Sequence, residues 1–121
     1  MKRLTPKEEQ VMDLLWEHGP LFVREMLEFY ERPRPHFNTV STVVRLLEDE
    51  GCVSHNAFGR NYQYYATLTC EEFKLQTLKD VINKYFENSY LGAVSKLVQD
   101  EDISLDELKE LVQQIENDQN Q

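Results

Sequence analysis

Apolar residues recur every three or four positions through the first fifty residues, which is the spacing of amphipathic helices. The first helix is predicted to begin after Thr5, which forms a capping-box pattern with Glu8, and to end at Gly19. The second is predicted to end before the prolines of residues 32–35, because a residue that precedes proline avoids helical geometry. The third is predicted over residues 38–51. Its apolar side is formed by Val40, Val43, Val44 and Leu47.

The spacing of apolar residues changes to every second position after the third predicted helix. In residues 52–56 and 62–67, apolar and polar side chains alternate as they do in half-buried strands. Phe58-Gly59-Arg60-Asn61 between them has the composition of a turn. Three helices followed by a hairpin within 70 residues is the order of a winged helix-turn-helix, so we expect a DNA-binding domain at residues 1–68.

Three more helices with wide apolar sides are predicted in residues 69–121, and they have no sheet of their own. Such helices need a partner surface, and we expect the same segment of a second chain, in a symmetric homodimer. The expected fold class is mainly α with a small β-hairpin wing, a winged helix-turn-helix followed by a helical dimerisation segment. The expected dimer contacts are Leu78, Ile82, Tyr85, Leu91, Val94, Leu97, Leu108, Leu111, Val112 and Ile115.

The net charge of −9 is unevenly distributed along the chain, so nucleic-acid binding has to be judged for each part separately. Residues 1–67 hold eight Lys and Arg against ten Asp and Glu, whereas residues 68–121 hold five Lys against twelve Asp and Glu. A phosphate backbone would be repelled by the second part. Only the first part is therefore a candidate for nucleic-acid binding.

The polar side of the third predicted helix supplies the main candidates for DNA contact. At 100° per residue, Asn38, Ser41, Thr42 and Arg45 lie opposite the valine side. Small hydroxyl residues allow close approach to base edges, a threonine methyl can touch a thymine methyl, and an arginine can donate two hydrogen bonds to guanine. Free amides near Asn38 and Thr39, at the helix start, suit a backbone phosphate. The full expected set is Arg34, His36, Asn38, Thr39, Ser41, Thr42, Arg45, His55 and Arg60.

This helix ends in three consecutive acidic residues, Glu48-Asp49-Glu50. Because they would repel phosphate, they argue against DNA binding by this helix. A helix docked by its N-terminal half would hold them away from DNA. Both alternatives stay open at this point.

The remaining reactive side chains are predicted to be structural. Cys52 and Cys70 are expected to be reduced thiols, and the three histidines have no metal-ligand spacing. No nucleophile with a nearby base and no glycine-rich phosphate loop is found in the sequence, so we expect no catalysis, no cofactor and no metal. No apolar run approaches the length of a membrane span and the start lacks the pattern of a signal peptide, so we expect a cytoplasmic protein without membrane insertion.

The order of motifs along the chain resembles the BlaI/MecI penicillinase repressor family, which also includes CopY-type copper-responsive repressors. The resemblance rests on Glu9–Trp16, Asn38–Gly51 and Gln63–Tyr65, and it extends over residues 4–116. It implies a dimeric winged-helix repressor that binds palindromic operator DNA and dimerises through its C-terminal helices. In the penicillinase branch, it also implies relief of repression by proteolysis, downstream of a membrane sensor metallopeptidase.

The chain departs from the family pattern at four places. Asp49 and Glu50 replace a basic pair, and Leu46 stands where the family has arginine, with Arg45 one position earlier. Lys96-Leu97 replaces the Asn-Phe bond that is cleaved in the penicillinase repressors, and the CopY-type cysteine cluster is absent from the sequence. Two other functions remain as alternatives, a winged-helix module for protein interaction and a winged-helix sensor of a small ligand.

Overall fold

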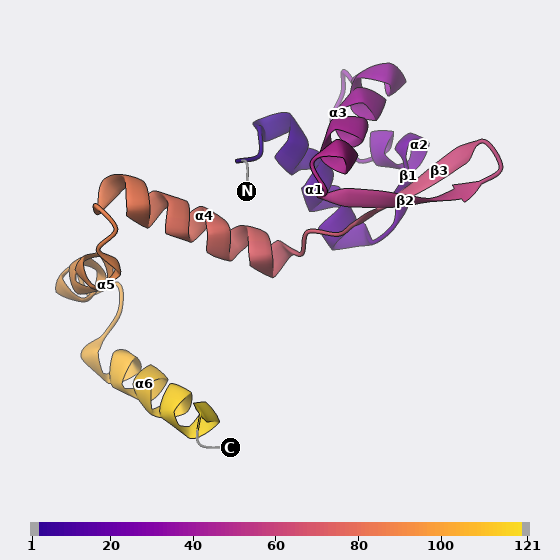
Figure 1. Cartoon of the computed structure of the whole chain (residues 1–121). Helices are drawn as coiled ribbons and strands as arrows, with labels where there is room; N and C mark the ends of the chain where they lie inside the picture. Colours follow the sequence, from indigo (N-terminus) through magenta and orange to yellow (C-terminus); the bar gives the residue numbers. More distant parts are fainter. Residues whose placement is uncertain (1–2, 120–121) are drawn as a thin grey trace. The chain divides into compact units, whose positions relative to one another are not determined.

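The computed structural model describes residues 3–119, which fall into two compact units divided between Thr77 and Leu78 (Figure 1). The division predicted at residue 68 stays a prediction. The helix Cys70–Tyr85 crosses this boundary. Its first turns belong to the first unit, where the ring of Phe73 lies 5.3 Å from that of Trp16.

The first unit is mostly helical with one small antiparallel sheet, which confirms the predicted fold class. Its strands are arranged in the order β1-β3-β2. The sequence pattern missed β1, whose two residues are too few to show a period of two. The elements are α1 (Pro6–His18), β1 (Leu21–Phe22), α2 (Val23–Leu27), α3 (Phe37–Asp49), β2 (Val53–Phe58) and β3 (Asn61–Ala66).

Helix α1 begins and ends as its sequence predicts. The amide of Glu8 donates to the Thr5 hydroxyl over 3.2 Å, and the amide of Thr5 donates to the Glu8 carboxylate over 2.9 Å. Gly19 ends the helix at φ +80°, a backbone conformation that residues with a Cβ rarely adopt. The predicted capping box of α1 is therefore confirmed.

The core of the first unit lies where α1, α2 and α3 meet the sheet. Trp16 is part of this packing, because its indole N–H donates to the carbonyl of Leu68 over 2.9 Å. The core residues include Val11, Met12, Leu15, Met26, Val40, Val44, Leu47, Val53 and Tyr64. Because both helices that precede α3 bury its valine side, the opposite side of α3 is left facing outward.

The helices that follow the sheet are α4 (Cys70–Tyr85), α5 (Tyr90–Gln99) and α6 (Leu105–Gln119). Ser89 caps α5 by accepting from the amide of Gly92, and Ser104 forms a capping box at the start of α6 with Glu107. The hydrogen bonds with Ser104 hold the pKa of the Glu107 carboxyl below its ordinary value. Among residues 3–119, every helix is too short or too polar to traverse a lipid bilayer.

Candidate nucleic-acid interface

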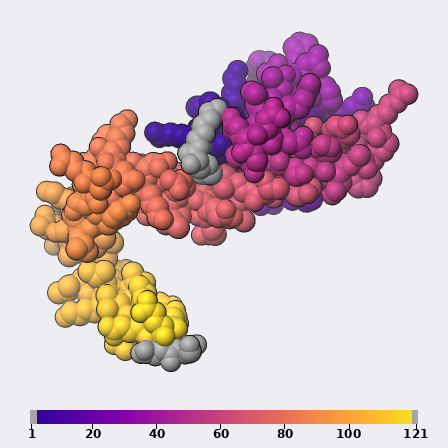
Figure 2. Space-filling view, viewed as in Figure 1, coloured from indigo at the N-terminus to yellow at the C-terminus, as the bar shows by residue number. Residues whose placement is uncertain are grey.

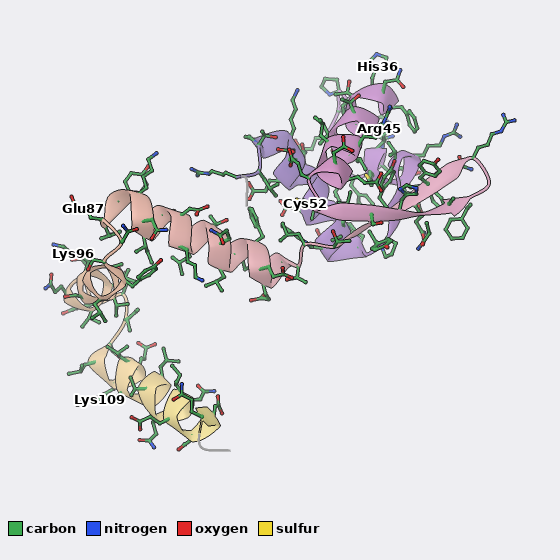
Figure 3. All side chains as sticks on the ribbon, viewed as in Figure 1. His36, Arg45, Cys52, Glu87, Lys96 and Lys109 are labelled. Carbon is green, nitrogen blue, oxygen red and sulfur yellow. The ribbon has the colours of Figure 1, made fainter. Side chains whose placement is uncertain are left out.

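An exposed polar side of α3 is the centre of the candidate interface. Asn38, Thr39, Thr42 and Arg45 are all exposed, as the sequence predicts. Leu46, which stands beside Thr42 on this side, is 50% exposed. Figure 3 shows His36 at the beginning of α3 and Arg45 further along the same helix. The exposed side therefore combines short polar residues, a guanidinium and one leucine.

Ser41 does not belong to this exposed side. It is 8% exposed, so the expectation that it lies bare for a DNA contact is wrong. Ser41 follows Val40 at the edge of the buried side, and it lines a groove between α2, α3 and β3. Its low exposure leaves little of the side chain for a base edge.

The hydroxyl of Thr42 is engaged within the helix. It donates to the carbonyl of Asn38 over 2.9 Å, a bond that serine and threonine often make with the preceding turn. This geometry fixes the side-chain rotamer. The methyl group of Thr42 is therefore the part of the side chain that remains free for an apolar contact.

Helix α3 begins one residue earlier than predicted. His36 is the N-cap, with no side-chain cap hydrogen bond, and Phe37 is the first helical residue. The amide of Thr39 donates to the His36 carbonyl over 3.0 Å, so the expected free amide at Thr39 is wrong. Arg34 and His36 are exposed just before the helix, where the helix dipole and their own donors favour an anion.

The groove between α2, α3 and β3 has a volume of about 630 Å³. Three arginines line it, Arg24 from the first turn of α2, Arg45 from α3 and Arg60 from the hairpin tip. The carboxylates of Glu25 and Glu48 also line it. Arginines from three separate elements therefore face the space beside the exposed side of α3.

The hairpin that borders this groove has a tighter turn than predicted. β2 pairs with β3 up to Phe58 opposite Asn61, which leaves only Gly59 and Arg60 as the turn. Gly59 has φ +65°, as two-residue hairpin turns require. Arg60 is exposed at this tip, and Figure 2 shows the end of the hairpin projecting from the surface. The wing therefore presents one cation at its extremity.

His55 of β2 makes contacts within the protein, and its predicted contact with DNA stays a prediction. Its Nδ1 forms a hydrogen bond with the carboxylate of Glu48. Its ring stacks on Tyr62, with centroids 4.1 Å apart, and meets the edge of Tyr64 at 5.6 Å. The acidic end of α3 thus contributes at least one carboxylate to a contact with the wing.

Tyr64 lies beneath this cluster and is 6% exposed. Burial raises the pKa of the Tyr64 phenol, the Glu48 carboxylate raises it further and the Arg45 guanidinium lowers it. The phenol therefore stays protonated and uncharged at neutral pH.

The residues expected at a dimer interface are mostly exposed in the single chain. Leu91 is 84% exposed, and the expected contacts of α6 are about half-exposed, apart from the partly buried Leu108. Ile82 is 8% exposed, so it packs within its own chain, and its predicted contact with a partner chain stays a prediction. The exposed members include Leu78, Tyr85, Leu97, Leu111, Val112 and Ile115, and Val94 is partly buried.

Leu46 and Arg24 are absent from the DNA-contact set predicted from the sequence. Leu46 interrupts the polar side of α3 and stands where the family has arginine, so the sequence marks it as a departure from the family pattern. Arg24 belongs to a short helix without a DNA-related pattern, because its place in the groove depends on how α2 packs against α3 and the sheet. Within residues 3–119, no three His, Cys, Asp or Glu side chains gather as a metal site would require.

Comparison with known proteins gives a match over almost the whole chain. Residues 4–117 match the model of the penicillinase repressor family. The methicillin resistance regulatory protein MecI of Mammaliicoccus sciuri is 26% identical over 109 residues, which cover 89% of each chain. MecI of Staphylococcus aureus strain N315 is 25% identical with the same coverage. A penicillinase repressor of Bacillus licheniformis is 19% identical over 119 residues, which cover 98% of this chain and 93% of that protein. These names describe regulators rather than enzymes.

Proposed function

The chain belongs to the penicillinase repressor family, and on that premise we propose that it is a dimeric repressor that binds palindromic operator DNA. In this proposal α3 enters the major groove and the wing contacts the neighbouring phosphate backbone. A repressor acts where the DNA is, so the proposal places the chain in the cytoplasm. The observation that carries it is the exposed side of α3 beside a groove lined by three arginines.

The exposed side of α3 supports direct contact with base edges. Arg45 has the two parallel donors that guanine accepts in the major groove, and Asn38 has the amide that adenine accepts. The methyl of Thr42 and the side chain of Leu46 are positioned on one side of the helix for thymine methyl groups. These contacts would supply the sequence preference.

The arginines around the groove support binding to the backbone. Arg24, Arg45 and Arg60 come from α2, α3 and the wing tip, so a phosphate strand that follows the groove meets cations along its path. The first 67 residues carry a net charge of only −2, whereas the rest of the chain carries −7. Electrostatics therefore favours docking through the first unit.

The exposed apolar side chains of α5 and α6 support a homodimer. No residue of α6 between Leu105 and Gln119 is buried in the single chain. Leucine, valine and isoleucine side chains repeat along one side of this helix and would lie in water without a partner. A second copy supplies an identical apolar surface, and its two-fold symmetry matches a palindromic operator.

Relief of repression by proteolysis is the regulatory part of the proposal. The Lys96-Leu97 bond, which takes the place of the family's cleaved bond, lies inside α5, and Figure 3 labels Lys96 on that helix. A protease needs an extended backbone, so cleavage there requires local opening of α5. We propose that a pathway with a membrane sensor metallopeptidase acts on this helix when it opens.

The proposal is tested by selecting binding sites from random duplex DNA with the purified chain. We expect enrichment of a palindrome with half-sites one helical turn, or a multiple of it, apart. Fluorescence anisotropy then measures affinity for the selected duplex and for a scrambled duplex of equal length. Equal affinity for the two duplexes, from a chain shown to be folded by circular dichroism, would overturn the proposal and favour a protein-interaction module.

A further inference from the structure

A hydrogen-bonded pair joins the end of α3 to the wing. Glu48 lies in the last turn of α3 and His55 lies on β2, and their side chains are 29% and 30% exposed. An ionised carboxylate can only accept hydrogen bonds, so the imidazole Nδ1–H is the donor. The pair connects the two elements that the proposed function assigns to the major groove and to the backbone.

Two tyrosines hold the imidazole in place for this contact. The rings of His55 and Tyr62 are nearly parallel, with an interplanar angle of 18°, and Tyr64 presents its edge at 60°. Stacking and edge contacts of this kind restrict rotation of the imidazole about its side-chain bonds. The Nδ1 atom is therefore kept facing the carboxylate before any ligand arrives.

The Glu48 carboxylate also lines the groove through which a phosphate strand would pass. An unpaired carboxylate at that position would repel phosphate. The other carboxylate of the groove, Glu25, accepts the amide of Phe22 over 2.9 Å. Glu48 instead faces a side chain that can become a cation, and a protonated imidazole beside it cancels its charge.

We propose that Glu48 and His55 are a positioning pair for operator binding, in which protonated His55 neutralises Glu48 and ties the wing to α3. This inference rests on the proposed function. It implies that operator binding is accompanied by proton uptake, because phosphate in the groove favours the protonated imidazole. It also gives the acidic end of α3 a role that is compatible with a polyanionic ligand.

Charged and titratable side chains from α2, α3, β3 and the wing tip surround the pair. On α3, the Arg45 guanidinium is always charged. On β3, burial and the Glu48 carboxylate raise the pKa of the Tyr64 phenol, so this phenol stays neutral at neutral pH, and the phenol ring of Tyr62 stacks on the imidazole. Arg24, Glu25 and Arg60 line the same groove.

The test is the affinity for the selected operator at pH 6.0 and pH 8.0, measured by fluorescence anisotropy at one salt concentration. We expect the unmodified chain to bind about tenfold tighter at pH 6.0, the size of effect that one charge near a phosphate gives at a partly exposed site. His55→Gln should remove most of this ratio and bind weakly at both pH values. Glu48→Gln with His55→Gln should recover affinity at both, because no carboxylate is left unpaired.

Two variants separate the pair from other histidines. His18→Gln changes a histidine at the end of α1 that stacks on Phe29, and it should keep the pH ratio of the unmodified chain. Each variant is also measured in a His36→Gln chain, which removes the exposed histidine at the start of α3 from the pH profile. Thermal unfolding followed by circular dichroism reports whether each variant folds.

The results separate this inference from the proposed function. If the unmodified chain binds no selected duplex at any pH, the proposed function fails. If it binds, but His55→Gln keeps the pH ratio, or the double variant binds no better than His55→Gln, the positioning pair is refuted. Should His55→Gln not fold, Glu48→Gln alone decides, because it is expected to bind at least as tightly as the unmodified chain at pH 8.0.

Discussion

Individual side chains on α3 show how small residues can determine a preference for one DNA sequence. Thr39, Thr42 and Leu46 are spaced at i, i+3 and i+7, so they follow one side of the helix. The Thr42 hydroxyl donates to the Asn38 carbonyl, which leaves its methyl outward. In the proposed complex, methyl and leucine contacts with thymine would add to the hydrogen bonds that Arg45 can make with guanine.

A matched pair of substitutions at Thr42 tests this assignment. Thr42→Ser removes the methyl and is expected to weaken binding to the selected operator by about fourfold, equivalent to the roughly 0.8 kcal/mol of one buried methyl or methylene. Thr42→Val keeps the methyl and is expected to bind within about twofold of the unmodified chain. Anisotropy titrations measure both. Weak binding by Thr42→Val together with normal binding by Thr42→Ser would show that the hydroxyl contacts the base.

Arg60 is expected to contact phosphate rather than bases. Arg60→Ala should weaken binding to selected and scrambled duplexes by the same factor, because a backbone contact carries no sequence information. It should also reduce the slope of log K against log salt by about 0.9 for each phosphate that the arginine neutralises in the unmodified chain. Lys109→Ala on α6 is the control, with an unchanged slope. A change of sequence preference at constant slope would contradict the assignment of the wing to the backbone.

At the scale of helices and strands, elements that repeat over several turns could be predicted from the sequence and short ones could not. The apolar spacing of α1, α3 and α6 persists over three turns or more, and capping residues mark the starts of α1 and α6. β1 could not be predicted, because its two residues are too few to show an alternating pattern. Tyr30 continues the apolar spacing of α2, but the helix ends at Leu27 because the chain turns at residues 28–30.

The predicted capping box of α1 has a measurable contribution to stability. Thr5→Ala removes the oxygen that accepts the amide of Glu8, and it should lower the free energy of unfolding by about 1 kcal/mol. Thr5→Ser keeps the oxygen and should restore most of this stability. Urea unfolding followed by circular dichroism compares the three chains. Equal stability of Thr5→Ala and the unmodified chain would show that water replaces the cap without cost.

The candidate site could be predicted only where it lies on one element. The exposed side of α3 follows from the helical period, so Asn38, Thr42 and Arg45 were identified from the sequence. The burial of Ser41 and the contact of His55 with Glu48 depend on α2 and the wing folding back on α3. No local pattern contains that information, because it arises from packing between distant segments.

At the scale of the whole molecule, the proposed dimer explains why so much apolar surface is exposed in the single chain. Leu108 and Leu111 lie on the apolar side of α6, and Leu111 is 50% exposed. Two chains that bury these sides against each other would remove that surface from water, at about 25 cal/mol per Å². The same pairing would place two copies of α3 for the two halves of a palindrome.

Charged substitutions on α6 test the dimer. Leu108→Asp with Leu111→Asp is expected to give monomers in sedimentation equilibrium, because buried unpaired carboxylates oppose association. Gln113→Asp with Asn117→Asp adds the same charge on the opposite side of α6 and should leave the dimer intact. An unchanged mass for the leucine variant would refute an interface through α6.

The central claim is that α3 and the wing form the surface that contacts DNA. Nuclear magnetic resonance of the isotope-labelled chain, titrated with the selected operator duplex, tests it most directly. The account predicts that the largest shifts of backbone amide signals occur in residues 38–46 and at the wing tip around Arg60. Shifts confined to α5 and α6, with residues 38–46 unchanged at saturation, would contradict it.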